Sequence, residues 1–291
     1  MEQNIQWYPG HMTKTKRMLI TQIGLIDVVV ELLDARVPLS SRNPDIDTLA
    51  KNKKRVLVLN KADLANPNIT ALWEKYFQDK GFFAMAVNAK NNDKKKGGTS
   101  KLAETLKIVM KEKSESQKKR GRINAPIRAM IVGIPNVGKS TFINQLSGRS
   151  STLVADKPGV TRGRQWIKVG SDFDLLDTPG VLWPKFDDQI VGHRLAAIGA
   201  INDGVLDKIT LGGYLLTMLS EIDANIITKR YNVELPGAIT SQQESFDFLE
   251  KIGKVRGFIK KGGVIDIERT AIILLDEFRG GKLGRITLER P

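Results

Sequence analysis

The chain of 291 residues has no cysteine, only two histidines and few aromatic residues, which make up 6% of it. The lack of cysteine excludes a disulfide framework, thiolate zinc sites and a cysteine nucleophile. No uninterrupted apolar run approaches the roughly 20 residues of a membrane-spanning helix, and residues 1–4 show no basic-then-apolar signal pattern. We therefore expect a cytoplasmic protein that has no membrane partner.

Positive charge is in excess, because 46 Lys and Arg stand against 32 Asp and Glu, a formal net charge of +14. An excess of positive charge of this size indicates that the protein binds an acidic partner. Ten basic residues stand against five acidic ones between positions 251 and 291, and Lys14, Lys16 and Arg17 could extend the same surface. RNA backbone binding is the economical explanation, since no basic amphipathic helix with bulky aromatic anchors points to a membrane surface.

Short apolar runs rich in β-branched residues predict strands of a mostly parallel sheet that is buried on both faces by helices. They alternate with segments of helical spacing at 69–78 and 100–111, which is the α/β signature. After Pro184 the pattern changes to longer amphipathic segments, with helices expected at 206–219 and 241–251. We expect two domains, at 1–182 and at 183–291, the second smaller and mainly helical. The expected strands lie at 26–33, 55–59, 82–87, 127–132 and 173–176.

Residues 133–140, Gly-Ile-Pro-Asn-Val-Gly-Lys-Ser, fit the pattern G-x-x-x-x-G-K-[ST] between a predicted strand and a predicted helix. The glycines let the backbone curl so that consecutive N–H groups face phosphates. Lys139 then reaches the β and γ phosphates, and the Ser140 hydroxyl ligates Mg²⁺. The expected nucleotide contacts of this loop are Asn136, Val137, Gly138, Lys139, Ser140 and Thr141.

Two further segments suit the γ phosphate and its metal ion. Asp177-Thr178-Pro179-Gly180 follows a predicted strand, so the Asp177 carboxylate can hold Mg²⁺ through water while the Gly180 N–H meets the γ phosphate. Between Ser140 and Asp177 there is room for one helix and one hairpin, as in a nucleotide switch protein. The loop 157–162 between them supplies one candidate hydroxyl, Thr161, to close over Mg²⁺.

Two motifs indicate a guanine base. Asn60-Lys61-Ala62-Asp63 ends a predicted strand, and the Asp63 carboxylate can accept hydrogen bonds from both the ring imino group and the exocyclic amine of guanine. Asn88-Ala89-Lys90, again just past a strand, offers the Ala89 N–H to the guanine keto oxygen. The predicted ligand is therefore GTP, with no other small-molecule substrate.

The order of these motifs is unusual, because the guanine motifs precede the phosphate loop. A circular permutation explains this order: the usual sheet is cut after Asp-x-x-Gly, and the old ends are rejoined through the polar stretch 111–122. The strand at 26–33 then becomes the one that normally follows the second switch. The nucleotide-binding core is thus complete within about residues 20–182.

Three features carry a resemblance to a known family: this motif order, the start 6–12 (Gln-Trp-Tyr-Pro-Gly-His-Met) and the segment 34–44 (Asp-Ala-Arg-Val-Pro-Leu-Ser-Ser-Arg-Asn-Pro). In these features the chain resembles the circularly permuted P-loop GTPases, above all the bacterial ribosome biogenesis GTPase A family. The resemblance covers nearly the whole chain. It implies a GTPase of late large-subunit maturation that binds ribosomal RNA and carries a helical C-terminal domain.

Catalysis needs a group that positions the attacking water, and here the position directly after Asp-x-x-Gly is Val181, which cannot do so. We expect His11, in a turn of the N-terminal extension, to take this role on the ribosome; the alternative is a histidine that packs beside Trp7 and Tyr8. Asn136 could help to ligate a K⁺ ion between the phosphates, or it could be a plain loop residue.

The expected activity is hydrolysis of GTP by a monomer that binds the large ribosomal subunit and its rRNA, promotes late assembly and leaves after hydrolysis. Two alternatives remain open. One is a GTPase that acts on the small subunit or on transfer RNA. The other is a nucleotide-gated RNA-binding protein with little hydrolysis, in which GTP is a structural ligand.

Overall fold

The computed structural model describes residues 10–89, 98–119, 125–148, 165–184, 186–204, 206–235 and 237–291. They form two compact units. The first contains the described residues from 10 to 184 together with Glu289–Pro291, and the second runs from 186 to 288. The chain therefore changes unit two residues beyond the 182/183 boundary drawn from the sequence.

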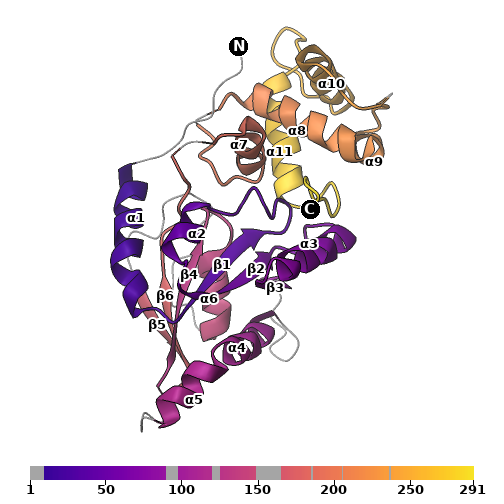
Figure 1. Ribbon diagram of the computed structural model, residues 1–291. Coiled ribbons are helices and arrows are strands. Elements are labelled where there is room, and N and C mark those ends of the chain that lie inside the picture. The colour runs from indigo at the N-terminus through magenta and orange to yellow at the C-terminus, as the bar shows by residue number, and fades with distance from the viewer. Residues whose placement is uncertain are drawn as a thin grey trace. The chain divides into compact units, whose positions relative to one another are not determined.

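A sheet forms the centre of the first unit (Figure 1), and its described strands follow the order β3-β2-β1-β4-β6-β5. Neighbouring strands are parallel except for β5 and β6, which form the predicted hairpin. The five strands expected from apolar runs are confirmed to within two residues at each end. The strands are β1 (Val28–Asp34), β2 (Lys54–Asn60), β3 (Phe83–Ala86), β4 (Ile127–Gly133), β5 (Gln165–Val169) and β6 (Phe173–Asp177).

The strand order confirms the circular permutation. The phosphate-loop strand β4 is central, with β6 on one side and β1 on the other. Counting from β4 as the first strand, β1 is the strand after the second switch, and it lies beside β4 as the permutation requires. Every residue of β1 is buried, as expected for an inner strand of a parallel sheet covered on both faces.

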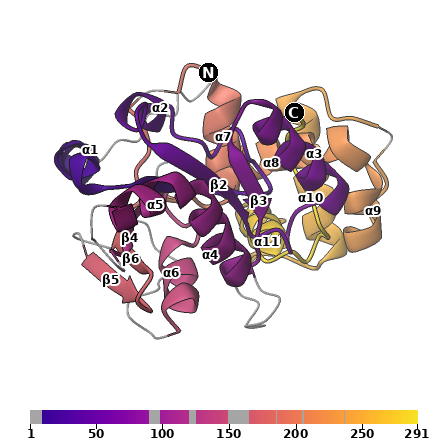
Figure 2. The ribbon, with the colours of Figure 1, turned by 60° about the horizontal axis from the view of Figure 1, so that its bottom comes forward.

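Helices cover both faces of this sheet, as predicted. Figure 2 shows α4 and α6 on one side, and α2 and α3 on the other. The polar stretch that begins at residue 111 forms a helix of its own as far as Lys119. The helices of this unit are α1 (Gly10–Gln22), α2 (Asp45–Leu49), α3 (Pro67–Asp79), α4 (Gly98–Val109), α5 (Lys111–Lys119) and α6 (Lys139–Ser147), with a 3₁₀ turn at Ile23–Leu25.

Helix α3 shows how local sequence builds the core on one face. Asn66 caps it by accepting hydrogen bonds from the N–H groups of Asn68 and Ile69, and Pro67 suits the first helical position. Trp73 and Phe77, four residues apart, lie on one face of the helix and stack with ring centroids 5.5 Å apart. Their cluster also includes Leu33 of β1, and Leu57 and Leu59 of β2.

The second unit is mainly helical. Close approach of its helices depends on small residues, since a Cβ on Gly212 would lie 2.6 Å from Ala271 Cβ and one on Gly253 would lie 2.6 Å from Thr270 Oγ1. No helix in the described part of the chain is long and apolar enough to cross a membrane. The helices are α7 (Gln189–Ala197), α8 (Lys208–Asp223), α9 (Asn225–Tyr231), α10 (Gln242–Val255) and α11 (Ile267–Arg279).

The last three residues of the chain, Glu289–Pro291, belong to the first unit. The buried Glu289 carboxylate accepts hydrogen bonds from the backbone N–H groups of Leu39 and Ser40 and from the Ser40 hydroxyl, the last at 2.5 Å. Its backbone carbonyl accepts one from Trp73 Nε1 at 3.1 Å. These contacts attach the end of the chain to the loop after β1 and to α3.

Candidate nucleotide site

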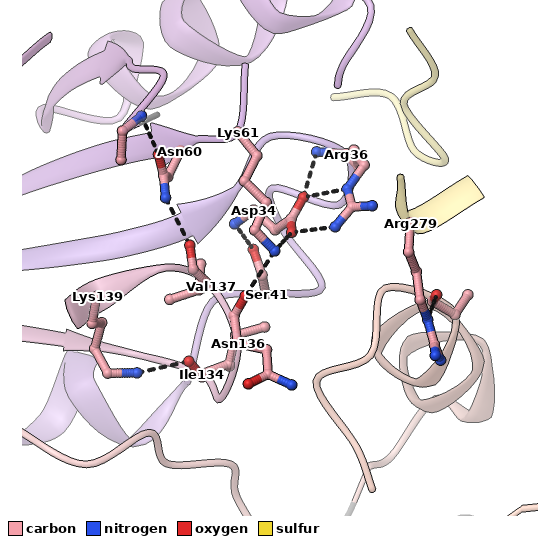
Figure 3. Close-up of polar contacts among 12 residues, drawn as sticks. Asp34, Arg36, Ser41, Asn60, Lys61, Ile134, Asn136, Val137, Lys139 and Arg279 are labelled. Carbon is pink, nitrogen blue, oxygen red and sulfur yellow. Dashed lines mark hydrogen bonds and ion pairs between the residues drawn. The ribbon is translucent and has the colours of Figure 1, made fainter. Parts of the chain in front are cut away.

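Several residues predicted to bind nucleotide lie at or just past the carboxyl ends of parallel strands. Asn60, Gly133 and Asp177 are the last residues of β2, β4 and β6, and Asp34, for which the sequence predicts no role, is the last residue of β1. Because these strands are parallel, their carboxyl ends meet at one edge of the sheet, where doubly wound proteins bind ligands. Figure 3 shows the loops after β1, β2 and β4 converging there.

The phosphate loop leads from β4 into α6. Gly138 stands just before the helix with φ of +98°, and a Cβ there would lie 2.6 Å from Asn60 Nδ2, so only glycine fits. Ser140 and Thr141 then occupy the first turn of α6, where backbone N–H groups have no partner within the helix. The loop therefore has the strand-to-helix context that the motif requires.

Asn60 joins the two guanine motifs to the phosphate loop. Its Nδ2 donates to the Val137 carbonyl at 2.8 Å, and its Oδ1 accepts from the Ala89 N–H at 3.1 Å (Figure 3). The Ala89 N–H, predicted to meet the guanine keto oxygen, is thus engaged by Asn60. Asp63 and Asn88 are half-buried near these loops, each just past its strand.

Lys61 makes a second link between the same loops. Its ammonium donates to the Asn136 carbonyl at 2.7 Å and lies 3.0 Å from an Asp34 carboxylate oxygen. Both Lys61 and Asn136 have positive φ, at 58° and 57°, which few residues other than glycine adopt. The conformations of the two loops are therefore tied to this contact.

Lys139 is buried at the start of α6. Its ammonium donates to the carbonyls of Gly133 at 3.0 Å and of Ile134 at 2.8 Å. Burial lowers the pKa of Lys139 to about 8, against the opposing influence of Asp177. A cation in this position favours an anionic ligand.

The Asp177–Gly180 segment packs on the phosphate loop. The Thr178 hydroxyl donates to the Ile131 carbonyl at 2.6 Å, and the Val181 N–H donates to the Gly133 carbonyl at 3.2 Å. A Cβ on Gly180 would lie 2.7 Å from backbone atoms of Pro135, so this position too requires glycine. Val181 is buried, which agrees with its being unable to orient water.

Three residues, the two histidines and Thr161, need separate comment. His11 lies in the first turn of α1, but its side chain is outside the described part of the structure, as is all of Thr161. His193 lies in α7 of the helical unit and stacks on Tyr214 with ring centroids 3.6 Å apart.

Sequence reasoning assigned no role to the loop after β1. The structure places Asp34 against Lys61, and it joins Asn43 Nδ2 to the Val181 carbonyl at 3.2 Å. Only the resemblance noted for residues 34–44 singled out this segment.

Comparisons with known proteins identify the family. Residues 128–245 match the family described as 50S ribosome-binding GTPase. Over 288 residues, 99% of this chain and 94% of the relative, the sequence is 46% identical to ribosome biogenesis GTPase A of Bacillus cereus. The chain belongs to the ribosome biogenesis GTPase A family.

Other members of the ribosome biogenesis GTPase A family agree with this assignment. The Bacillus licheniformis protein is 42% identical over 99% of this chain and 98% of its own length. Among solved structures, GNP-bound YlqF from T. maritima aligns with a TM-score of 0.64 at 27% identity, over 96% of this chain and 98% of that one. A GDP-bound YlqF structure aligns equally well, with a TM-score of 0.64 at 26% identity, over 94% of this chain and 99% of that one. Those two structures of YlqF contain GNP and GDP.

Asp177 gives a prediction about stability within this ribosome biogenesis GTPase A fold. Burial raises its pKa to about 6 from an ordinary 3.8, against the lowering influence of Lys139. At pH 7 the carboxylate is ionised in both folded and unfolded chains, so it lowers the free energy of unfolding by about 2–3 kcal/mol. This cost is complete above pH 6, decreases as the pH falls from 6 to 3.8, and is absent below 3.8.

Asp177→Asn is therefore expected to raise the free energy of unfolding at pH 7, measured by urea denaturation without nucleotide or Mg²⁺. Asp174→Asn, at a half-buried position on the same strand, is the control and should change it little. A less stable Asp177→Asn protein would contradict the prediction.

Proposed function

We propose that the protein hydrolyses GTP on the large ribosomal subunit, promotes a late step of its assembly and leaves after hydrolysis. The observation that carries the proposal is the meeting of the phosphate loop with both guanine motifs through Asn60. The family description, 50S ribosome-binding GTPase, supports the large subunit over the small subunit or transfer RNA.

The roles of individual residues follow from this placement. Asp63 reads the guanine edge, and Lys61 and Asn60 hold the base-binding loop against the phosphate loop. Backbone N–H groups of residues 136–141 and the Lys139 ammonium bind the phosphates, and the Gly180 N–H meets the γ phosphate. Asn88 and Ala89 complete the base pocket.

The residues present fit a Mg²⁺ ion. Asp177 is buried, and neither carboxylate oxygen accepts a hydrogen bond from a described side chain. With the hydroxyls of Ser140 and Thr161 it provides the oxygen donors that Mg²⁺ prefers, Asp177 acting through water. The ion would neutralise charge that develops on the phosphate oxygens.

The helical unit supplies the proposed RNA surface. Lys254, Lys260 and Lys261 are exposed around the turn that joins α10 to α11. In the part of the chain that the structure describes, Lys260 is the one of these three with an acidic neighbour, Asp266 at 3.3 Å. Phosphate contacts of this kind suit structured RNA, which proteins recognise by shape.

The test is GTP turnover by the purified protein alone and with isolated large or small ribosomal subunits. We expect stimulation by the large subunit, and His11→Ala should lower the stimulated rate by about 10²-fold if His11 acts on the water. His193→Ala, which removes a histidine stacked on Tyr214, is the matched control. Absence of stimulation by either subunit would favour the nucleotide-gated RNA-binding protein and would leave His11 a structural residue.

A possible K⁺ requirement is tested separately. The positive φ of Asn136 holds the phosphate loop in the conformation described above, and its side chain is a candidate K⁺ ligand. Turnover is compared in KCl and NaCl at equal ionic strength. Equal rates would remove the cation from the mechanism.

A further inference from the structure

The end of β1 brings a carboxylate to the back of the guanine-binding loop. Asp34 pairs in register with Asn60 of the parallel strand β2, so its side chain lies beside Lys61, the next residue along the chain. We propose that Asp34 is a positioning residue for guanine nucleotide binding, which holds the Lys61 ammonium against the phosphate loop without touching the nucleotide. This inference rests on the proposed GTP site.

Asp34 is fully buried, and the partners of its carboxylate among the described residues are cationic or backbone groups. Oδ1 accepts from Arg36 Nε at 2.9 Å and from the Arg36 N–H at 3.1 Å, while Oδ2 accepts from Arg36 Nη2 at 2.8 Å and lies 3.0 Å from Lys61 Nζ. Burial alone would raise the pKa of Asp34, but Arg36 and Lys61 hold it well below the usual range of a carboxyl. Asp34 is therefore charged under all ordinary conditions.

The orientation of Asp34 is itself set by its neighbours. Arg36 is 1% exposed and forms a two-pronged pair with the carboxylate, a geometry that only a guanidinium provides. The Asp34 N–H donates to Ser41 Oγ at 3.0 Å, which ties the loop after β1 back to the strand. Figure 3 shows Arg36 on the side of Lys61 away from Lys139.

Lys61 then connects three loops at one point. Its ammonium contacts Asp34 after β1 and the Asn136 carbonyl after β4, while its own backbone precedes Asp63 after β2. A lysine side chain free to rotate loses rotamer entropy when it is fixed. With Asp34 in place, that ordering is completed before nucleotide arrives, and binding does not have to supply it.

Loss of Asp34 should therefore weaken nucleotide binding without slowing the chemical step. Asp34→Asn is expected to raise the Kd for GDP by about 10- to 100-fold, the effect of one charge-assisted hydrogen bond. Single-turnover hydrolysis at saturating GTP should stay within about twofold, since the described side-chain contacts of the Asp34 carboxylate are with Arg36 and Lys61 and not with the groups proposed to bind the phosphates. An unchanged Kd, or a hydrolysis rate that falls as much as the affinity does, would overturn the inference.

A double-mutant cycle tests whether Asp34 affects GDP affinity through its contact with Lys61. In a Lys61→Met background, Asp34→Asn should cost less than about twofold in GDP affinity, because the contact it removes is already absent. Additive losses would overturn the inference. Asp45→Asn, which removes a carboxylate 2.8 Å from Lys16 on α1, is the control and should leave GDP affinity unchanged.

Asp34→Asn also leaves Arg36 buried with a weaker partner, so its effect on folding must be separated from its effect on binding. In Asp34→Asn/Arg36→Met the buried guanidinium is gone, and the thermal midpoint should recover while GDP affinity stays low. Recovery of both would show that Asp34 serves only to satisfy Arg36, which would overturn the inference.

Binding of GDP to the unmodified protein is measured first. Its absence would contradict the proposed function and this inference together, whereas normal binding with an unaffected Asp34→Asn contradicts this inference alone.

Discussion

Asp63→Asn is expected to convert the site from guanine to xanthine nucleotides. The Asp63 carboxylate offers two acceptors to the imino and amino groups of guanine, whereas an asparagine offers one acceptor and one donor. The donor would face the exocyclic amine of guanine but would meet the carbonyl that xanthine has in its place. The imino group then keeps only a neutral acceptor, and the bond to the exocyclic amine is replaced by two donors that face each other, which together correspond to a fall in GTP affinity of about 10³-fold.

Competition between a fluorescent nucleotide and either GTP or xanthosine triphosphate measures the change of preference from guanine to xanthine nucleotides. A variant that bound both poorly would indicate damage to the fold, so Asp79→Asn at the exposed end of α3 serves as the control. Unchanged GTP affinity in Asp63→Asn would contradict the assignment of Asp63 to the base.

Lys139→Met should weaken GTP binding by about 10²- to 10³-fold, because the ammonium is the buried cation of the phosphate loop. The same substitution should also remove a pH dependence of GTP affinity. Burial lowers the pKa of Lys139 to about 8 in the free protein, and phosphates raise it again, so binding takes up a proton above pH 8. GTP affinity therefore falls as the pH rises above 8, by at most about 10-fold per pH unit.

Isothermal titration between pH 7.5 and 9 in buffers of different ionisation enthalpy measures both the affinity and the proton uptake. Lys75→Met, at an exposed position on α3, is the matched control and should keep the slope. If GTP affinity still fell with rising pH in Lys139→Met, the proton would belong to another group.

Much of the nucleotide site is predictable because its motifs are local. A strand followed by a glycine-rich turn and a helix fixes where Lys139 and Ser140 lie relative to one another, and parallel strands bring their carboxyl ends to one edge. The convergence of residues 60, 88, 138 and 177 follows once the strands are identified. The permutation follows in the same way, since it concerns only the order of these elements.

The contacts of Asp34 are different, because they depend on register between strands. Nothing in residues 34–36 indicates that Asp34 pairs opposite Asn60 or that its carboxylate meets Lys61. The engagement of the Ala89 N–H by Asn60 is likewise a matter of loop geometry that spacing along the chain does not encode. His11 and Thr161 stay predictions from the sequence.

Some helices were not predicted, for different reasons. Helix α11 has clear helical spacing, and its buried residues include Ala271, Leu274, Leu275 and Phe278. From the many charges of the segment 251–291, the sequence predicts an RNA-binding surface and not a particular helix. Helix α2 is only five residues long, too short for periodicity to detect.

The hydrogen bonds of Glu289 to Ser40 and Trp73 make the helical unit an insertion in the chain of the first unit, not an appendage at its end. If that unit unfolds while Glu289 stays bound, roughly a hundred residues become a loop whose closure carries an entropic cost. Unfolding of the helical unit therefore favours release of the chain end. Chain connectivity alone thus couples the unfolding equilibria of the two units, whatever surfaces they present.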